Sequence, residues 1–236
     1  MKSKFIVSFL LLLVLAALCV SGAGCGDKRE LVEESSVDAT GETVESPTDP
    51  ARTVTMNGRS VMGGWMEHWG YDWSGPVEEN GYFIDYKELD ASELDNMSSS
   101  FAANVEGLPS GSVVFFKFCF ADFYSDNLGD LERIVDSVVE TAREKGLRLI
   151  IGNALPVRKQ DGSAAQVSEY KKYNAYLGRI AGENPQAWVY DFYGVLSGAD
   201  GFLQPGYDVG DSHLNSDAYR ALDATFFPLL ERVYSQ

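Results

Sequence analysis

Histidine and cysteine are both scarce in this chain, and their scarcity limits its chemistry. The 236 residues contain two histidines, His68 and His213, and three cysteines. Two separated histidines without a Cys/His cluster argue against a metal centre, so we expect no metal. A mechanism that needs a histidine base has only these two candidates.

Basic residues and phosphate-binding loops are also in short supply. The chain has 19 Lys and Arg against 35 Asp and Glu, for a formal net charge of -16. Nucleic-acid binding needs clustered positive charge, so this balance argues against a nucleic-acid partner. Neither GxxxxGK[ST] nor GxGxxG occurs, so no nucleotide cofactor is expected. The 45% hydrophobic content is nevertheless ample for a folded core.

The N-terminus has the pattern of an export signal. Lys2 and Lys4 precede an apolar run at 5–20, and small residues lead up to Cys25. The letters "GAGC" resemble the lipobox of bacterial lipoproteins, which implies lipidation of Cys25. The chain is then exported and anchored by lipid to the cell membrane, on its periplasmic or extracellular face. Plain secretion and a retained single anchor are the alternatives.

This interpretation divides the chain into three segments. Residues 1–24 are the predicted signal peptide. Residues 25–52 are acidic and rich in Ser and Thr, so we expect a solvated tether there, with a functional acidic tail as the alternative. Residues 53–236 form the predicted domain. Once Cys25 carries lipid and Cys19 has left with the signal, Cys119 is the single thiol, and no internal disulfide is possible.

In the domain, apolar runs alternate with helix-length amphipathic segments. This alternation is typical of a parallel sheet covered by helices. We expect an α/β three-layer sandwich with a five-stranded parallel sheet in flavodoxin-like order and helices on both faces. The predicted strands are TVTMNG (53–58), YFIDYKEL (82–89), SVVFFKFCF (112–120), LRLIIGNAL (147–155) and WVYDFY (188–193). Cys119, between two phenylalanines, is predicted to be a buried core thiol.

Three long helices are predicted around this sheet, over 127–146, 167–182 and 215–234. Gly146 suits the end of the first. Asn215 or Ser216 can cap the third, and Pro228 should kink or restart it.

An open parallel sheet binds its ligand beyond the carboxyl ends of its strands. Ser60 follows the first predicted strand, and His213 follows the last one in the polar loop YDVGDSHLN. Both loops should open on the same edge, so Ser60 and His213 can meet. Ser60 is a nucleophile in this interpretation and a plain helix cap in the alternative. His68 lies among aromatic residues in the sequence, and we expect it to pack against them or to lie at the surface without a catalytic role.

The segments GRSVMGG and DSHLN together resemble the SGNH (GDSL-like) hydrolases, over 54–236. VVFFKFCFADF also resembles a third-strand segment of a bacterial branch of that superfamily. The resemblance implies that Ser60 is the nucleophile, His213 the base and Asp211 the carboxylate that orients it. Asp208 is the alternative carboxylate.

Three positions depart from the family pattern. Gly210 stands where the family's late Asp-x-x-His block has its Asp, and Asp211 lies two residues before His213 instead. Arg59 stands where the family usually has an acid, and KFCF (117–120) stands where it has Gly-x-Asn-Asp, which supplies an oxyanion donor. We therefore expect the Ser60 backbone N–H to stabilise the oxyanion, with Gly63, Gly64 or Lys117 as the second donor. In the alternative interpretation the glycines allow close packing and Lys117 points to water. Asn153, a further candidate, is expected to cap or turn the chain.

The function implied is a serine esterase that removes O-acyl groups, acetyl above all, from a carbohydrate or another small ester. An O-acyltransferase and a non-catalytic carbohydrate-binding or envelope protein are the alternatives. The aromatic residues after Ser60 suit either a sugar-binding cleft or core packing: Trp65, Trp69, Tyr71 and Trp73.

Overall fold

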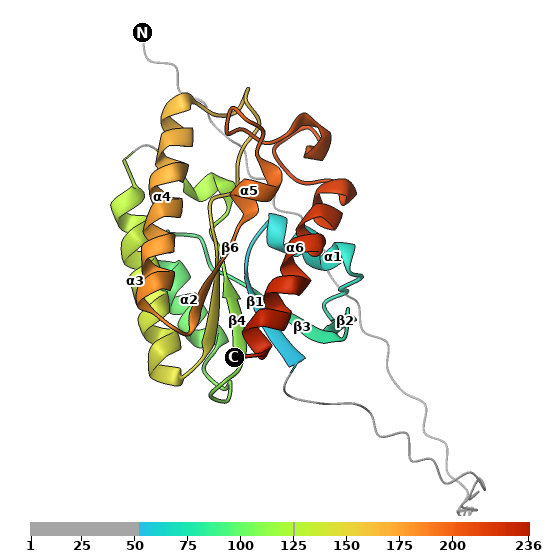
Figure 1. Cartoon of the computed structure of the whole chain (residues 1–236), viewed down its shortest axis with the longest axis vertical. Coiled ribbons are helices and arrows are strands. Elements are labelled where there is room, and N and C mark those ends of the chain that lie inside the picture. The colour runs from blue at the N-terminus through green and yellow to red at the C-terminus, as the bar shows by residue number, and fades with distance from the viewer. Residues whose placement is uncertain (1–51, 125) are drawn as a thin grey trace, which may run out of the picture. The chain divides into compact units, whose positions relative to one another are not determined.

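The computed structural model describes residues 52–124 and 126–236 (Figure 1). The predicted export signal, the predicted lipidation site Cys25 and the predicted tether up to residue 51 lie outside the described residues. Among the helices of the described ranges, none has the length and apolar character that a bilayer crossing requires.

The centre of the fold is a six-stranded sheet in the order β2-β3-β1-β4-β5-β6. Its strands are β1 (Thr53–Gly58), β2 (Val77–Glu79), β3 (Tyr82–Glu88), β4 (Val113–Phe116), β5 (Arg148–Gly152) and β6 (Ala187–Tyr190). All pairs are parallel except β2 with β3. The five predicted strands and their flavodoxin-like order are thus confirmed. The short antiparallel β2, added at one edge, is a sixth strand that the sequence did not predict.

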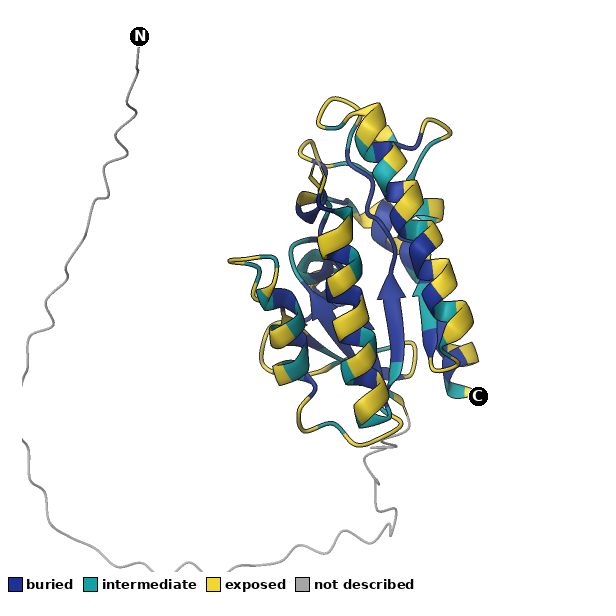
Figure 2. Cartoon of the chain, turned by 90° about the vertical axis from the view of Figure 1, so that its left-hand side faces the viewer, coloured by how far each residue is buried: buried dark blue, intermediate teal, exposed yellow. Residues whose placement is uncertain are grey.

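Helices cover both faces of the sheet, as predicted. They are α1 (Val61–His68), α2 (Asn96–Asn104), α3 (Leu128–Lys145), α4 (Ala164–Glu183), α5 (Phe192–Leu196) and α6 (Ser216–Tyr234), with short 3-10 turns η2 (Phe120–Asp122) and η3 (Pro205–Tyr207). One apolar cluster joins the sheet to α1, α5 and α6, and a second joins its other face to α2, α3 and α4. In Figure 2 the buried strands lie behind helices whose outward faces are exposed.

The ends of the long helices follow their sequence signals. Gly146 ends α3 in the left-handed conformation, with φ 66°. The Asn215 side chain caps α6 by accepting from the N–H groups of Asp217 and Ala218. The restart expected at Pro228 does not occur, since α6 continues to Tyr234. Buried residues on both sides of the proline, such as Phe226 and Leu230, hold the helix against the sheet.

The strand predicted over 112–120 is shorter than expected and ends at Phe116. The chain then leaves the sheet and turns through η2. The Asp122 carboxylate accepts from the backbone N–H of Cys119 at 2.6 Å, which fixes this turn. Cys119 is buried, as predicted, although it lies in the turn and not in a strand.

Candidate active site

Ser60 lies between β1 and α1 in a conformation that is unusual for serine. Its φ of 54° falls in the left-handed range that side chains other than glycine rarely adopt. Although it occupies the N-cap position of α1, its side chain makes no capping hydrogen bond. The Ser60 Oγ instead lies 2.8 Å from Nε2 of His213. The hydroxyl therefore contacts an imidazole 153 residues away in the sequence.

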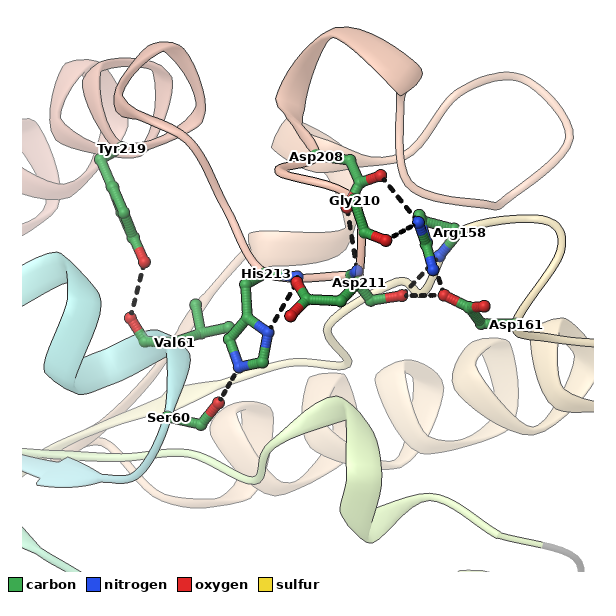
Figure 3. Close-up of polar contacts among 10 residues, drawn as sticks. Ser60, Val61, Arg158, Asp161, Asp208, Gly210, Asp211, His213 and Tyr219 are labelled. Carbon is green, nitrogen blue, oxygen red and sulfur yellow. Dashed lines mark hydrogen bonds and ion pairs between the residues drawn. The ribbon is translucent and has the colours of Figure 1, made fainter.

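His213 in turn contacts Asp211. The distance from His213 Nδ1 to Asp211 Oδ1 is 2.9 Å, and the backbone N–H of His213 donates to the same oxygen at 3.2 Å. The hydrogen bond from the His213 side chain lowers the pKa of the Asp211 carboxyl below its ordinary value. Figure 3 shows the three side chains in line, with Ser60 at the start of α1 and the other two in the loop before α6.

Asp208, the alternative carboxylate, has other partners. Its Oδ1 accepts from the backbone N–H of Ser212 at 2.9 Å, and its Oδ2 lies 3.5 Å from Nη1 of Arg158. Of the two aspartates considered from the sequence, Asp211 is the one that contacts the imidazole.

An ion pair joins Arg59 to Asp122, which lies two residues beyond the KFCF segment. The guanidinium of Arg59 contacts the carboxylate of Asp122, which is buried with 4% of its side chain exposed. Burial lowers the pKa of Arg59, but the hydrogen bond and charge of Asp122 outweigh this effect and leave the pKa raised. The residue before Ser60 is thereby tied to the turn after β4. The sequence analysis missed Asp122, although an acid shortly after a predicted strand was a usable signal.

The turn that contains Asp122 also contacts the histidine. The ring of Phe120 lies edge-on to the imidazole of His213, with 5.4 Å between the ring centroids. Asp122 and Phe120 belong to the same 3-10 turn. The ion pair of Arg59, the residue before Ser60, therefore links the Ser60 backbone to the turn that contacts His213.

One interpretation of the sequence had the Lys117 side chain point to water, and the structure shows that this is wrong. Its side chain is fully buried beside Gly58 and Gly152, which end two strands. A Cβ at Gly152 would come within 2.9 Å of the Lys117 Cβ, and one at Gly58 within 3.3 Å of its Cγ. The ammonium donates to the Phe118 carbonyl at 3.1 Å. Burial lowers the pKa of Lys117 to about 8.

The glycines after Ser60 lie in α1 against tyrosine rings. The N–H of Gly64 donates to the Ser60 carbonyl at 3.0 Å, and a Cβ at this position would collide with the hydroxyl of Tyr219. A Cβ at Gly63 would lie 3.6 Å from the hydroxyl of Tyr86. Gly64 therefore serves close packing of α1, whereas a Cβ at Gly63 would make only an ordinary van der Waals contact. The amide of Gly64 already has an acceptor.

Asn153 has structural partners on both sides of its amide. Its Nδ2 donates to Asp191 at 2.7 Å, and its Oδ1 accepts from the backbone N–H of Tyr193 at 2.9 Å. Asn153 therefore fastens the end of β5 to α5.

Most of the aromatic cluster belongs to the core. Trp65, Trp69 and Tyr71 are buried, and Trp73 is exposed. The indole N–H groups of Trp65 and Trp69 both donate to Asp223 of α6. His68 lies beside the same acid at 3.6 Å and stacks on Tyr219, so it serves packing at the surface of α6.

A cavity of about 390 Å³ opens beside Asp211. The residues that line it are Phe120, Ala121, Phe123, Val157, Arg158, Asp161, Gln166, Asp211 and Ser212. Its wall therefore combines apolar side chains from the turn after β4 with polar ones from the loop after β5. Within the described ranges, no group of three or more His, Cys, Asp or Glu side chains could hold a metal ion.

Comparison with known proteins identifies the fold. No protein-family profile and no curated protein sequence matches the chain. Among solved structures, a GDSL-like lipase from Bacteroides thetaiotaomicron matches with a TM-score of 0.61 and 16% identity, over 79% of this chain and 91% of the lipase.

Two further structures agree. A member of the lipolytic protein G-D-S-L family from Veillonella parvula matches with a TM-score of 0.56 and 18% identity, over 77% of this chain and 99% of that protein. The acetyl xylan esterase AlAXEase matches with a TM-score of 0.55 and 12% identity, over 75% of this chain and 98% of the esterase. The chain therefore has the SGNH hydrolase fold, as its sequence predicted.

Proposed function

We propose that this protein is a serine ester hydrolase in which Ser60 is the nucleophile, His213 the general base and Asp211 the residue that orients the imidazole. The observation that carries the proposal is the continuous contact from Ser60 Oγ to His213 Nε2 at 2.8 Å and from His213 Nδ1 to Asp211 at 2.9 Å. A hydroxyl is a weak nucleophile unless a base accepts its proton, and this arrangement supplies that base.

The reaction has two halves. Nε2 of His213 takes the proton of Ser60 as its Oγ attacks the ester carbonyl, and the carbonyl π electrons move to the oxygen. The imidazolium, held by Asp211, then gives the proton to the departing alcohol, which leaves an acyl group on Ser60. Water repeats the cycle: it loses a proton to His213, attacks the acyl carbon and releases the acid and free Ser60.

The oxyanion formed in each half needs donors. We assign the backbone N–H of Ser60 as the first and keep Gly63, Gly64 and Lys117 as candidates for the second. The Gly64 amide already donates to the Ser60 carbonyl, which favours Gly63 and Lys117. A buried ammonium at a sheet end supplies positive charge where water cannot screen it. Loss of one oxyanion donor typically lowers kcat by about 100- to 1000-fold.

The proposed substrate is an O-acylated carbohydrate or another small ester, with acetyl as the acyl group. The cavity of about 390 Å³ beside Asp211 is within the size range of pockets that bind whole small molecules, such as a small ester. The likeness to an acetyl xylan esterase supports the same class of substrate. Export and lipid anchoring through Cys25 are part of this proposal and are tested by labelling cells with a radioactive fatty acid.

The first test is hydrolysis of p-nitrophenyl acetate by the purified protein and by its Ser60→Ala variant. Release of nitrophenolate that depends on Ser60 supports the hydrolase, and equal rates in both proteins reject it. Adding an alcohol acceptor distinguishes an O-acyltransferase, which forms a new ester instead of free acetate. Carbohydrate binding that survives in Ser60→Ala, without turnover in the wild type, identifies the non-catalytic alternative, which the missing Gly-x-Asn-Asp segment favours.

A further inference from the structure

Ser212, between Asp211 and His213, is buried and directs its hydroxyl to the loop after β5. Its residue is 2% exposed, whereas the neighbouring side chains of Asp211 and His213 are 66% and 43% exposed. The Ser212 hydroxyl donates to Asp161 at 2.8 Å and accepts from the backbone N–H of Arg158 at 3.1 Å. The turn at 208–213 thus places the side chains of Asp211 and His213 at the site. It anchors the side chain of Ser212, between them, to the loop after β5.

Arg158 holds the same turn from its other side. Its Nε lies 2.6 Å from Asp161 Oδ2, and its Nη1 contacts the carbonyl of Gly210 and lies 3.5 Å from Asp208 Oδ2. One guanidinium therefore bridges the loop after β5 and two points of the turn, as Figure 3 shows. Hydrogen bonds from Arg158 and then Ser212 lower the pKa of the Asp161 carboxyl, which favours its charged form.

The turn needs such support because its backbone is unusual. Gly210 and Ser212 both have positive φ, at 119° and 72°. For serine this conformation costs free energy and persists when its surroundings fix it. An isolated surface ion pair contributes little, but a planar guanidinium that contacts two carboxylates and a carbonyl limits both the position and the orientation of the chain.

We propose that Arg158 is a positioning residue, which acts with Asp161 and Ser212 to fasten the 208–213 turn to the loop after β5 and so aims the His213 imidazole at Ser60. The effect of Arg158 on the rate of hydrolysis rests on the proposed esterase function. Its effect on the position of the His213 imidazole does not. Arg158 also lines the cavity beside Asp211, so binding of an anionic substrate is the competing role. Its contacts with Asp161, Asp208 and Gly210 favour positioning.

Steady-state kinetics separate these two roles. We expect Arg158→Ala to lower kcat for p-nitrophenyl acetate by about 10- to 100-fold, because a small displacement of a general base has a large effect on rate. KM should stay within about two-fold of the wild type. Arg158→Lys should recover part of the loss in kcat, since an ammonium keeps the positive charge but lacks the planar set of donors of a guanidinium. Arg143→Ala, which removes an exposed arginine paired with Glu140, is the matched control and should leave both constants unchanged.

A second measurement reads the imidazole directly and needs no activity. The chain has two histidines, so His68 serves as an internal reference in 15N-1H spectra of the imidazoles. Arg158→Ala should shift or broaden the His213 signals and leave those of His68 in place. Ser212→Ala, which keeps the guanidinium contacts, should cause a smaller change of the same kind and provides a second variant where Arg158→Ala fails to fold.

The outcomes are distinct. An inactive wild type rejects the proposed function, and the spectra still test the positioning role. Unchanged His213 signals in Arg158→Ala, together with an unchanged kcat, overturn the positioning role. A rise in KM confined to esters that carry a negative charge overturns it in favour of substrate binding.

Discussion

The guanidinium of Arg59 and the carboxylate of Asp122 form an ion pair across the edge of the sheet where β1 and β4 end. Arg59 directly precedes Ser60, and Asp122 ends the turn whose Phe120 contacts His213. Arg59 stands where the SGNH pattern has an acid, and Asp122 lies two residues beyond the KFCF segment that replaces Gly-x-Asn-Asp. The pair therefore connects the residue before Ser60 to the turn that contacts His213, and the resemblance gave no indication of this connection.

Removing one partner of this pair should be costly. Asp122→Ala leaves the partly buried Arg59 without its acid and leaves the Cys119 N–H without its acceptor. We expect the free energy of unfolding to fall by on the order of 2–4 kcal/mol, measured by urea denaturation. The control is Asp217→Ala, which breaks an exposed pair with Arg220 and should cost less than about 1 kcal/mol. Equal losses in the two variants would contradict a structural role for Asp122.

The two aspartates near His213 should differ in their effect on rate. Asp211→Asn removes the charged acceptor of the imidazole Nδ1–H, so kcat should fall by about 100- to 10,000-fold. Asp208→Asn keeps an oxygen that can accept from the Ser212 N–H and should cost far less. Single-turnover acylation rates of both variants measure the difference, and a larger loss in Asp208→Asn would reverse the assignment.

Lys117 should make stability depend on pH. Burial lowers its pKa in the folded protein from 10.5 to about 8. Between these values the unfolded chain holds the proton and the folded one does not, so this lysine makes stability rise with pH. Below about pH 8 both states are charged, and the folded state keeps the full desolvation cost.

Lys117→Met removes this cost without removing the side-chain volume. At pH 7 the variant should be more stable than the wild type by on the order of 1–3 kcal/mol. This advantage should shrink as the pH approaches 10. Urea denaturation of both proteins at several pH values measures it, and an advantage that does not change with pH would contradict a buried, titrating lysine.

Gly64 and Tyr219 should be coupled. A methyl group at Gly64 meets the hydroxyl of Tyr219, which is buried between α1 and α6. Gly64→Ala should therefore destabilise the protein by about 1–3 kcal/mol, despite the better helix propensity of alanine. Tyr219→Phe removes the oxygen and should recover much of this loss in the double variant. Additive effects in the thermal melts of the three variants would contradict the contact.

The fold was largely predictable because its signals are local and periodic. The five parallel strands and the three long helices each show a clear apolar pattern, and α3 and α6 also have the capping residues Gly146 and Asn215. The strand β2 is three residues long and largely polar, so it has no pattern to detect. The helix α2 is rich in Ser and Asn, and Met97 and Phe101 hold it by packing against the core.

The site was predictable where topology alone decides it. Ser60 and His213 follow the first and last strands, so the parallel order brings them to one edge. The environment of Lys117 was not predictable, because it depends on the space that Gly58 and Gly152 leave on neighbouring strands. The ion pairs of Arg59 with Asp122 and of Arg158 with Asp208 join side chains that are distant in sequence, and no local pattern indicates such pairs.

The most direct test of the proposed nucleophile is covalent labelling of the intact chain with a fluorophosphonate, followed by peptide mass spectrometry. The reagent phosphonylates a serine that a neighbouring base activates, with loss of fluoride, and needs no knowledge of the substrate. We predict one adduct, on Ser60, which forms far more slowly in His213→Ala. No adduct on Ser60, or one that forms equally fast without His213, would contradict the account.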